Sequence, residues 1–211
     1  MQWEREMRLQ CPLCYMAYCD CRCQPRMMKR AGCTAFLKLA PYGEGATYRV
    51  AHRMVLDLKR RPMSRVTQYL SGELAPSVLE ALSAAGVSAQ NAVITYLPRH
   101  PRKRRREGTD QAKELASALS ASMQIPCTAL IGRYGKSREQ KKLNAKHRAE
   151  NLKEEFFLRG NATRRFVILV DDLITTGASV SVITKLLLDA GASGVLAVAL
   201  AWTERKTRSE C

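Results

Sequence analysis

Two adjacent carboxylates, Asp171 and Asp172, follow an apolar run and precede a short hydroxyl-rich stretch in the segment FVILVDDLITTGAS. A carboxylate pair accepts hydrogen bonds from a diol or holds a Mg²⁺ ion. The stretch after the pair offers hydroxyls and backbone N–H groups at the start of an expected helix, which suits a phosphate group. Its members are Thr175, Thr176, Gly177, Ala178 and Ser179. We therefore predict a site for a phosphorylated sugar. The alternative is an ordinary turn in which Asp172 caps the next helix.

Cysteines are concentrated near the start of the chain, where six of the eight precede residue 34. Cys11 and Cys14 form a Cys-x-x-Cys pair, in which both thiolates can bind one tetrahedral Zn²⁺ ion. In a reducing compartment such a cluster indicates structural zinc more than disulfides. The alternative is a set of free thiols in a mobile segment. The candidates for the two remaining positions are Cys19, Cys21 and Cys23, with Cys33 as a further one, and the sequence does not choose among them.

A basic run extends from Arg99 to Arg106, in a chain whose formal net charge is +16. Such a balance favours polyanionic partners, including nucleic acid and phosphorylated metabolites. We expect the run itself to form a solvated or disordered loop, because like charges repel one another. Steering of an anionic substrate and contact with a nucleic-acid backbone are the functional alternatives. No aromatic residue interrupts the run to stack on bases.

The elements that must position these residues follow an alternating pattern from residue 91 onwards. Apolar runs that read as buried strands alternate with amphipathic helices, which is typical of a parallel sheet covered on both faces. Residues 47–90 read as mostly helical. Strands are expected at 92–98, 127–131, 166–170 and 194–202, and helices at 109–123, 138–153 and 181–191. The diacid would then lie at the carboxyl end of a strand, where open parallel sheets bind ligands.

The segment VILVDDLITTGAS resembles the phosphoribosyl-pyrophosphate (PRPP) signature of the type I phosphoribosyltransferases. The resemblance implies that Asp171 and Asp172 contact the ribose hydroxyls as the catalytic pair. It also implies that the turn from Thr175 to Ser179 wraps the 5′-phosphate. Leu97, Pro98 and Arg99 take the place of the pyrophosphate-binding loop, which in that family often has a non-proline cis peptide or a basic residue. The alternative there is a strand-ending proline followed by a solvated arginine.

The chain as a whole resembles the ComF-like, competence-associated branch of that family, including GntX-type proteins. The cysteine-rich head supports this resemblance, and so do two later elements. The first is an Arg-Gly-Phe-Asn-Gln segment in the family and is altered here, between Arg106 and Gln111. The second is closer, because its expected residues stand in order: Arg133, Gln140, Arg148 and Asn151. A helix cap and a surface hydrogen bond are the alternatives for the last three.

The resemblance implies a fold, a ligand and two alternative functions. The fold is an α/β, type I phosphoribosyltransferase-like parallel sheet flanked by helices, with a small zinc-binding head. The ligand is PRPP, bound with Mg²⁺, and the reaction is transfer of the phosphoribosyl group to an acceptor. No general base or acceptor pocket is recognisable in the sequence. The alternative is a non-catalytic DNA-uptake adaptor that binds single-stranded DNA and a helicase partner. A regulator that senses a nucleotide or PRPP without turning it over is a third possibility.

These observations divide the chain into three expected parts. Residues 1–36 form the cysteine-rich zinc-binding head, 37–90 a helical hood or linker, and 91–211 the phosphoribosyltransferase-like core. No apolar run approaches the roughly 18 residues that span a bilayer. The charged stretch MQWEREMRLQ lacks the apolar middle of a signal peptide. We therefore expect a cytoplasmic protein without membrane insertion.

Overall fold

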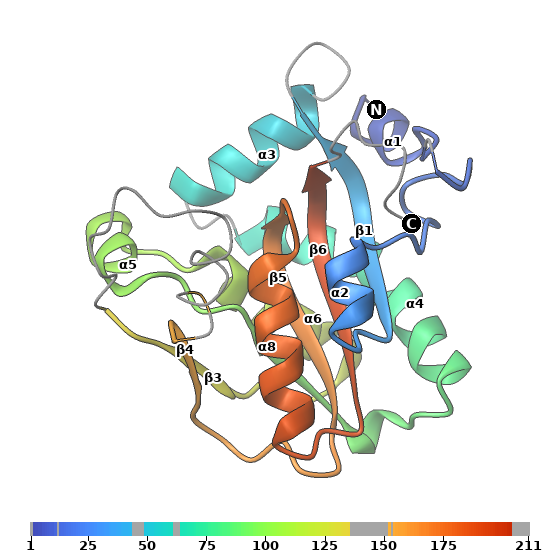
Figure 1. Ribbon diagram of the computed structural model, residues 1–211. Coiled ribbons are helices and arrows are strands. Elements are labelled where there is room, and N and C mark those ends of the chain that lie inside the picture. Colours follow the sequence, from blue (N-terminus) through green and yellow to red (C-terminus); the bar gives the residue numbers. More distant parts are fainter. Residues whose placement is uncertain are drawn as a thin grey trace.

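The main sheet has four strands, all parallel, in the order β1-β6-β5-β2 (Figure 1). The computed structural model describes residues 2–11, 13–43, 49–60, 64–135, 152 and 154–203. The strands are β1 (Ala35–Tyr42), β2 (Ala92–Tyr96), β5 (Phe166–Ile174) and β6 (Gly194–Thr203). The predicted parallel sheet is confirmed, and three of its strands are those expected from apolar runs.

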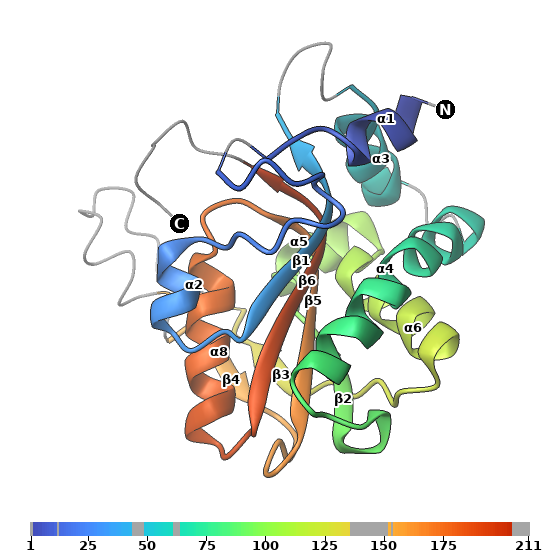
Figure 2. The same cartoon turned by 90° about the vertical axis from the view of Figure 1, so that its right-hand side faces the viewer.

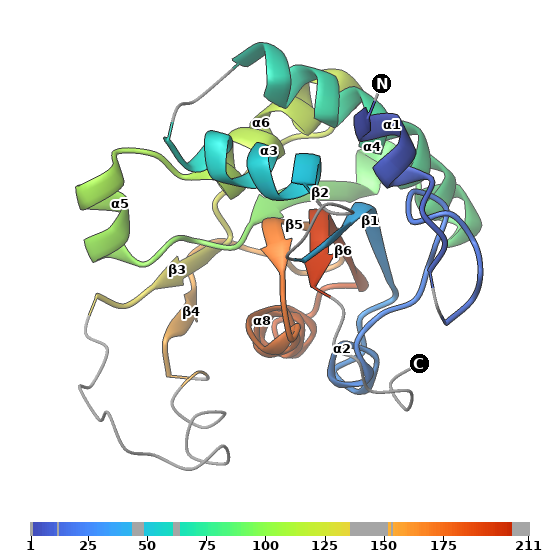
Figure 3. The same cartoon turned by 90° about the horizontal axis from the view of Figure 1, so that it is seen from above.

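Helices cover both faces of this sheet, with α2 and α8 on one face and α4 and α6 on the other (Figures 2 and 3). Their bounds are α2 (Arg26–Arg30), α4 (Ser64–Ala84), α6 (Gln111–Met123) and α8 (Ala178–Asp189). Along β5, alternate side chains enter two separate cores. Phe166 and Ile168 pack with the core on the α4–α6 side, whereas Val167 and Leu169 pack with the core beneath α8. Burial on both faces explains why the strand is continuously apolar.

The remaining helices of the described residues lie around the sheet. They are α1 (Gln2–Met7), α3 (Arg49–Arg60), α5 (Pro101–Glu107) and a 3₁₀ turn, Ala89–Asn91. Helices α1 and α3 lie at the end toward which the strands point (Figure 1). None of the described helices combines the length and the apolarity needed to cross a membrane.

Strand β1 was not expected, although it forms an edge of the main sheet and pairs with β6. Two residues interrupt the pattern by which this strand could be recognised in the sequence. Pro41 lacks a backbone donor, and a proline is tolerated in a sheet chiefly on an edge strand. Lys38 interrupts the apolar pattern, yet only 1% of it is exposed. The strand therefore joins the cysteine-rich segment directly to the sheet.

From Pro101 onwards the basic run is helical, so the expected loop is corrected to α5 over this part. His100 caps this helix by accepting a hydrogen bond from the Arg102 backbone N–H, and Pro101 occupies its first turn. Gly108 ends the helix in the left-handed conformation, with φ of 70°. These capping contacts, which proline and glycine favour at the two ends, outweigh the mutual repulsion of the arginines.

The strand expected at 127–131 is reduced to a single parallel bridge between Ile94 and Cys127. The chain instead forms β3 (Ile131–Arg133), which pairs antiparallel with β4 (Phe156–Leu158) in a separate two-stranded sheet. The helix expected at 138–153 lies almost entirely outside the described residues. Helices α4, α6 and α8 confirm the other expected helical segments.

Candidate ligand pocket and metal centre

Asp171 and Asp172 lie within β5, three and two residues before its end at Ile174, whereas the sequence placed them at the carboxyl end of the strand. Strand β5 continues to Ile174 because β6 remains paired with it. On its other side β2 ends at Tyr96, which pairs with Val170. The diacid therefore begins directly after Val170, the residue of β5 that pairs with the last residue of β2.

Each carboxylate of the pair accepts a hydrogen bond from the backbone of the next residue. The Asp172 N–H donates to Asp171 Oδ1 and the Leu173 N–H donates to Asp172 Oδ1, both at 2.8 Å. Burial, followed by repulsion from the Asp172 carboxylate, raises the pKa of Asp171 well above its ordinary value. Asp110, which caps α6, adds to this effect. A bound cation or a sugar hydroxyl would stabilise the ionised pair.

The loop after β5 turns sharply at Gly177, whose φ is 77°, and enters α8. The Thr176 hydroxyl accepts a hydrogen bond from the Ala178 backbone N–H at 3.3 Å. Thr175 is exposed, while Thr176, Ala178 and Ser179 are half-buried. Hydroxyls and backbone N–H groups are thus gathered at the start of a 12-residue helix, which is the arrangement that attracts phosphate.

A cavity of about 350 Å³ lies beside this loop. The loop contributes Thr175 and Thr176, and the end of β6 contributes Trp202 and Thr203. The remaining lining comes from the α2 region and consists of Pro25, Arg26, Met27 and Arg30. Two arginines, Arg26 and Arg30, therefore line the same cavity as the hydroxyl-rich loop. The sequence gives no sign of these arginines as site residues, because their proximity to the loop depends on the packing of α2 against α8.

Arg99 is not the solvated residue considered as an alternative from the sequence. Its guanidinium contacts the Glu107 carboxylate and the Gln111 side-chain oxygen, and it donates to the Thr109 carbonyl at 3.3 Å. Its backbone N–H donates to the Asp110 carboxylate at 3.4 Å. The structure thus joins two of the predicted elements, the 97–99 loop and the 106–111 segment. The described residues contain no cis peptide bond.

Of the second ComF-type element, only Arg133 lies among the described residues. Its guanidinium donates to the Glu155 carboxylate at 2.6 Å and stands 5.1 Å from the Phe156 ring. These contacts link β3 to the segment that leads into β4. Gln140, Arg148 and Asn151 lie outside the described residues.

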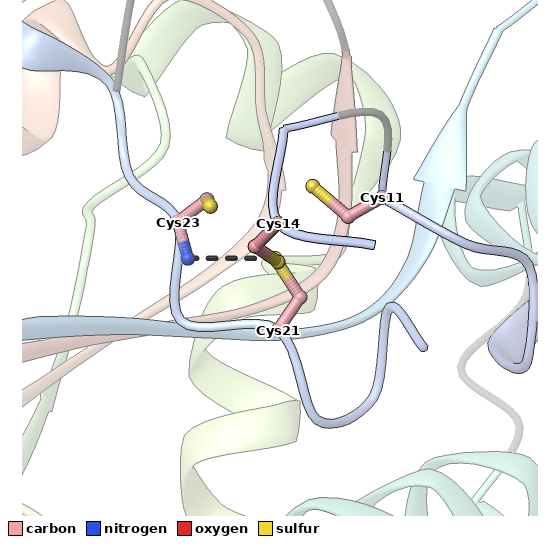
Figure 4. Close-up of side chains that lie close together, drawn as sticks. All are labelled: Cys11, Cys14, Cys21 and Cys23. Carbon is pink, nitrogen blue, oxygen red and sulfur yellow. Dashed lines mark hydrogen bonds between the residues drawn. The ribbon is translucent and has the colours of Figure 1, made fainter. Parts of the chain in front are cut away.

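Four cysteines come together near the amino-terminal end, with their sulfur atoms all within 4.8 Å of one another. They are Cys11, Cys14, Cys21 and Cys23 (Figure 4). A tetrahedral zinc ion with Zn–S bonds of about 2.3 Å separates its sulfur ligands by about 3.8 Å, so the set fits such an ion. Cys14 and Cys21 are already at 3.5 Å. The cluster can therefore hold a metal such as zinc.

The Cys-x-x-Cys turn is shaped by backbone hydrogen bonds. The Cys11 N–H donates to the Met16 carbonyl and the Tyr15 N–H to the Cys11 carbonyl, both at 2.8 Å. Gln10 and Ala17 form an antiparallel bridge across the turn. Burial opposes ionisation of Cys14, but hydrogen bonds from the Met16 backbone and from neighbouring thiols lower its pKa. A lowered thiol pKa favours the thiolate that binds metal.

The structure leaves two of the candidate ligands outside this cluster. Cys19 packs against the core on the α4–α6 side. Cys33 donates from its thiol to the Ala35 carbonyl at 3.2 Å, and burial raises its pKa to about 11. A thiol that is buried away from the cluster and resists ionisation is a poor metal ligand. The choice that the sequence left open is thereby narrowed to Cys21 and Cys23.

Sequence comparison finds relatives with names connected to DNA use. DNA utilization protein YhgH of Escherichia coli K12 is 30% identical over 143 residues, which are 67% of this chain and 63% of that protein. Competence protein F of Haemophilus influenzae is 36% identical over 102 residues, 46% of this chain and 44% of that protein. The chain thus spans slightly less than two thirds of the length of YhgH. No family model matches.

Among solved structures, similarity extends to phosphoribosyltransferases. A hypoxanthine phosphoribosyltransferase of Staphylococcus aureus has 13% identity and a TM-score of 0.44, over 71% of this chain and 70% of that one. A purine phosphoribosyltransferase of Pyrococcus horikoshii has 16% identity and a TM-score of 0.39, over 64% of this chain and 82% of that one.

The fold is that of an α/β protein of the open-sheet class, with a parallel sheet between two helical layers. It carries a diacid and a hydroxyl-rich loop at the carboxyl end of β5, and a cysteine cluster near the amino terminus. The named relatives identify it more narrowly. The chain is a relative of DNA utilization protein YhgH and of Competence protein F, in agreement with its resemblance to the ComF-like proteins.

Proposed function

We propose that the carboxyl end of the sheet, around the end of β5, binds PRPP or a related phosphoribosyl ligand. The observation that carries this proposal is the placement of the Asp171–Asp172 pair near the end of β5, five residues before Gly177 at the start of α8. The two carboxylates can accept hydrogen bonds from ribose hydroxyls, while the hydroxyls and backbone N–H groups of the turn can donate to a 5′-phosphate. The resemblance of this segment to the PRPP signature supports the same assignment.

In this proposal each part of the site has one task. The carboxylates at 171 and 172 hold the ribose hydroxyls, and the residues from Thr175 to Ser179 surround the 5′-phosphate. Leu97, Pro98 and Arg99 form the loop that faces the pyrophosphate. Mg²⁺ supplies positive charge to the pyrophosphate when it is bound. The arginines of α2, Arg26 and Arg30, add positive charge beside the loop.

Transfer of the phosphoribosyl group is the activity that such binding would serve. The bond between the anomeric carbon and pyrophosphate breaks, a bond to an acceptor nitrogen forms, and the acceptor loses a proton. Positive charge develops on the ribose in between, and the two carboxylates stabilise it. The acceptor is not identified, so binding and transfer are tested separately.

Calorimetric titration with PRPP, with and without Mg²⁺, tests the binding step. We expect micromolar, Mg²⁺-dependent binding that is lost in the double variant Asp171→Asn/Asp172→Asn. Asp189→Asn is the matched control, because Asp189 is an exposed carboxylate at the far end of α8. Absence of heat in the wild-type protein would exclude PRPP as the ligand, and loss of binding in the control would indicate a nonspecific charge effect.

We also propose that the four-cysteine cluster holds a structural zinc ion. A structural zinc ion contributes directly to the folding energy of the segment that holds it. Measurement of bound metal should give one zinc per chain, lost when Cys11 and Cys14 are replaced by serine. Cys33→Ser, outside the cluster, should retain the ion.

A second candidate function is a DNA-uptake adaptor that binds single-stranded DNA and a helicase partner. The observation that favours it is α5, whose five exposed basic residues run consecutively, together with the names of the relatives. These residues are Arg102, Lys103, Arg104, Arg105 and Arg106. If they bind DNA, replacing them with glutamine should weaken binding and flatten its salt dependence. Unchanged affinity would exclude contact by α5.

A further inference from the structure

Lys38, on the edge strand β1, is buried beside the cysteine cluster, with 1% of its surface exposed. Its ammonium group donates to the Cys21 sulfur and to the Cys21 carbonyl, both at 3.2 Å, and to the Cys23 carbonyl at 2.8 Å. An ammonium group has three donor hydrogens, so these three acceptors satisfy it. Two of the four clustered cysteines therefore meet the same lysine.

Two aromatic rings complete the surroundings of this ammonium group. It lies 4.8 Å from the centre of the Phe36 ring and 5.1 Å from that of Trp202. Such cation–π contacts stabilise a positive charge that is removed from water, but only partly. Within the described part of the chain no carboxylate forms an ion pair with Lys38. A buried cation without a negative partner is costly.

The cysteine cluster would supply the missing negative charge once it is loaded with metal. A zinc ion held by four thiolates carries a net charge of −2, because four negative sulfurs exceed the two positive charges of the ion. We propose that Lys38 is the buried counter-charge of this metal–thiolate centre and that its hydrogen bond to the Cys21 sulfur increases the affinity for zinc. This inference rests on the proposal that the four cysteines bind zinc.

The arrangement explains why a lysine interrupts a buried strand. An apolar residue at position 38 would fit β1 but would leave the charge of the loaded cluster unbalanced beneath the sheet. Lys38 is therefore a positioning residue that acts on the metal through Cys21. Partners of this kind around metal ligands commonly change metal affinity by about 10–100-fold when they are removed.

Zinc affinity of the full chain, measured by competition with a chromophoric chelator, tests this inference. Lys38→Met keeps the length of the side chain but removes the charge, and we expect it to weaken zinc binding by about 10–100-fold. Lys29→Met is the matched control, because Lys29 is an exposed lysine on α2. It should stay within about twofold of the wild-type protein. In the cobalt-substituted protein, Lys38→Met should also shift the sulfur-to-cobalt absorption band.

Lys38→Arg separates charge from packing if Lys38→Met fails to fold. Arginine keeps the charge and the hydrogen-bond donors, so we expect Lys38→Arg to bind zinc more tightly than Lys38→Met. If Lys38→Met does not fold, Lys38→Arg should bind zinc within about tenfold of the wild-type affinity. If a folded Lys38→Met variant binds zinc as tightly as the wild-type protein, Lys38 has no such role, although the cluster can still bind zinc. The same conclusion follows if Lys38→Arg loses more zinc affinity than Lys38→Met. A wild-type chain that binds no zinc would overturn the zinc proposal, and this inference with it.

Discussion

Gly177 and Met28 are packed so closely that no side chain fits between them: a Cβ atom on Gly177 would lie 2.7 Å from the sulfur of Met28. Met28 belongs to α2, which follows the cysteine cluster, and Gly177 forms the turn of the hydroxyl-rich loop between β5 and α8. The segment that carries the clustered cysteines therefore also forms one wall of the proposed ligand site. This contact connects two features that lie far apart in the sequence.

Gly177→Ala should destabilise the protein and abolish phosphate binding. The substitution strains the left-handed backbone by about 1–2 kcal/mol, and the clash with Met28 adds about 1–3 kcal/mol. Thermal unfolding would measure the combined loss. Gly86→Ala is the control for backbone strain alone, because Gly86 has φ of 67° but open space around it. Met28→Ala combined with Gly177→Ala should lose less than the sum of the single changes. Strict additivity would argue against the clash.

Asp171→Asn should stabilise the protein at neutral pH while removing ligand binding. Burial and Asp172 raise the pKa of Asp171, so the unfolded chain ionises this group more readily than the folded one. Stability is therefore lost as pH rises above about 4, the ordinary aspartate range. The gain from Asn should be largest near pH 7 and should vanish below pH 4. Each 1 kcal/mol would raise Tm by about 2–4 °C.

Melting curves of wild type and Asp171→Asn across pH 4–8 would check this expectation. Asp189→Asn, at an exposed position, provides the comparison and should leave Tm nearly unchanged at every pH. A lower Tm for Asp171→Asn at pH 7 would mean that the carboxylate makes net favourable contacts in the folded protein.

If the cysteine cluster holds zinc as proposed, removal of the ion should loosen the loop between β5 and α8 as well as the cysteine-rich segment. Cys23 and Pro25 lie on the same short stretch, and Pro25 and Met28 pack against Gly177. If the ion is lost, this stretch loses its fixed point, and the loop loses its neighbours. Hydrogen exchange with and without a zinc chelator should show faster exchange in residues 21–30 and also in 175–181. Unchanged exchange in 175–181 would show that the sheet alone holds the loop.

The sequence predicted those parts of the structure whose cause is local. Continuous apolar runs identified β2, β5 and β6, and the diacid with its glycine turn identified the edge where the candidate site lies. Strand β1 escaped prediction because Lys38 and Pro41 break the apolar pattern. Lys38 is accommodated by the cysteine cluster and Pro41 by the edge position, and both reasons are visible only in three dimensions.

Which cysteines form the cluster could likewise be predicted only in part from the sequence. Spacing identified Cys11 and Cys14, but Cys19, Cys21 and Cys23 alternate along one short stretch and all could reach an ion by spacing alone. Packing decides between them, because Cys19 contacts the core on the other side. The arginines of α2 were also unpredictable, since their contact with the loop depends on how α2 packs against α8.

Arg99→Lys should lower Tm even though the positive charge is kept. The planar guanidinium of Arg99 contacts Glu107, Gln111 and the Thr109 carbonyl at once, and the compact ammonium group of lysine does not span these acceptors. We expect Tm to fall by about 2–4 °C and hydrogen exchange at 107–111 to increase. Arg102→Lys, at an exposed position of α5, should change neither. If both variants melt like the wild type, the network around Arg99 does not hold the 97–99 loop against the start of α6.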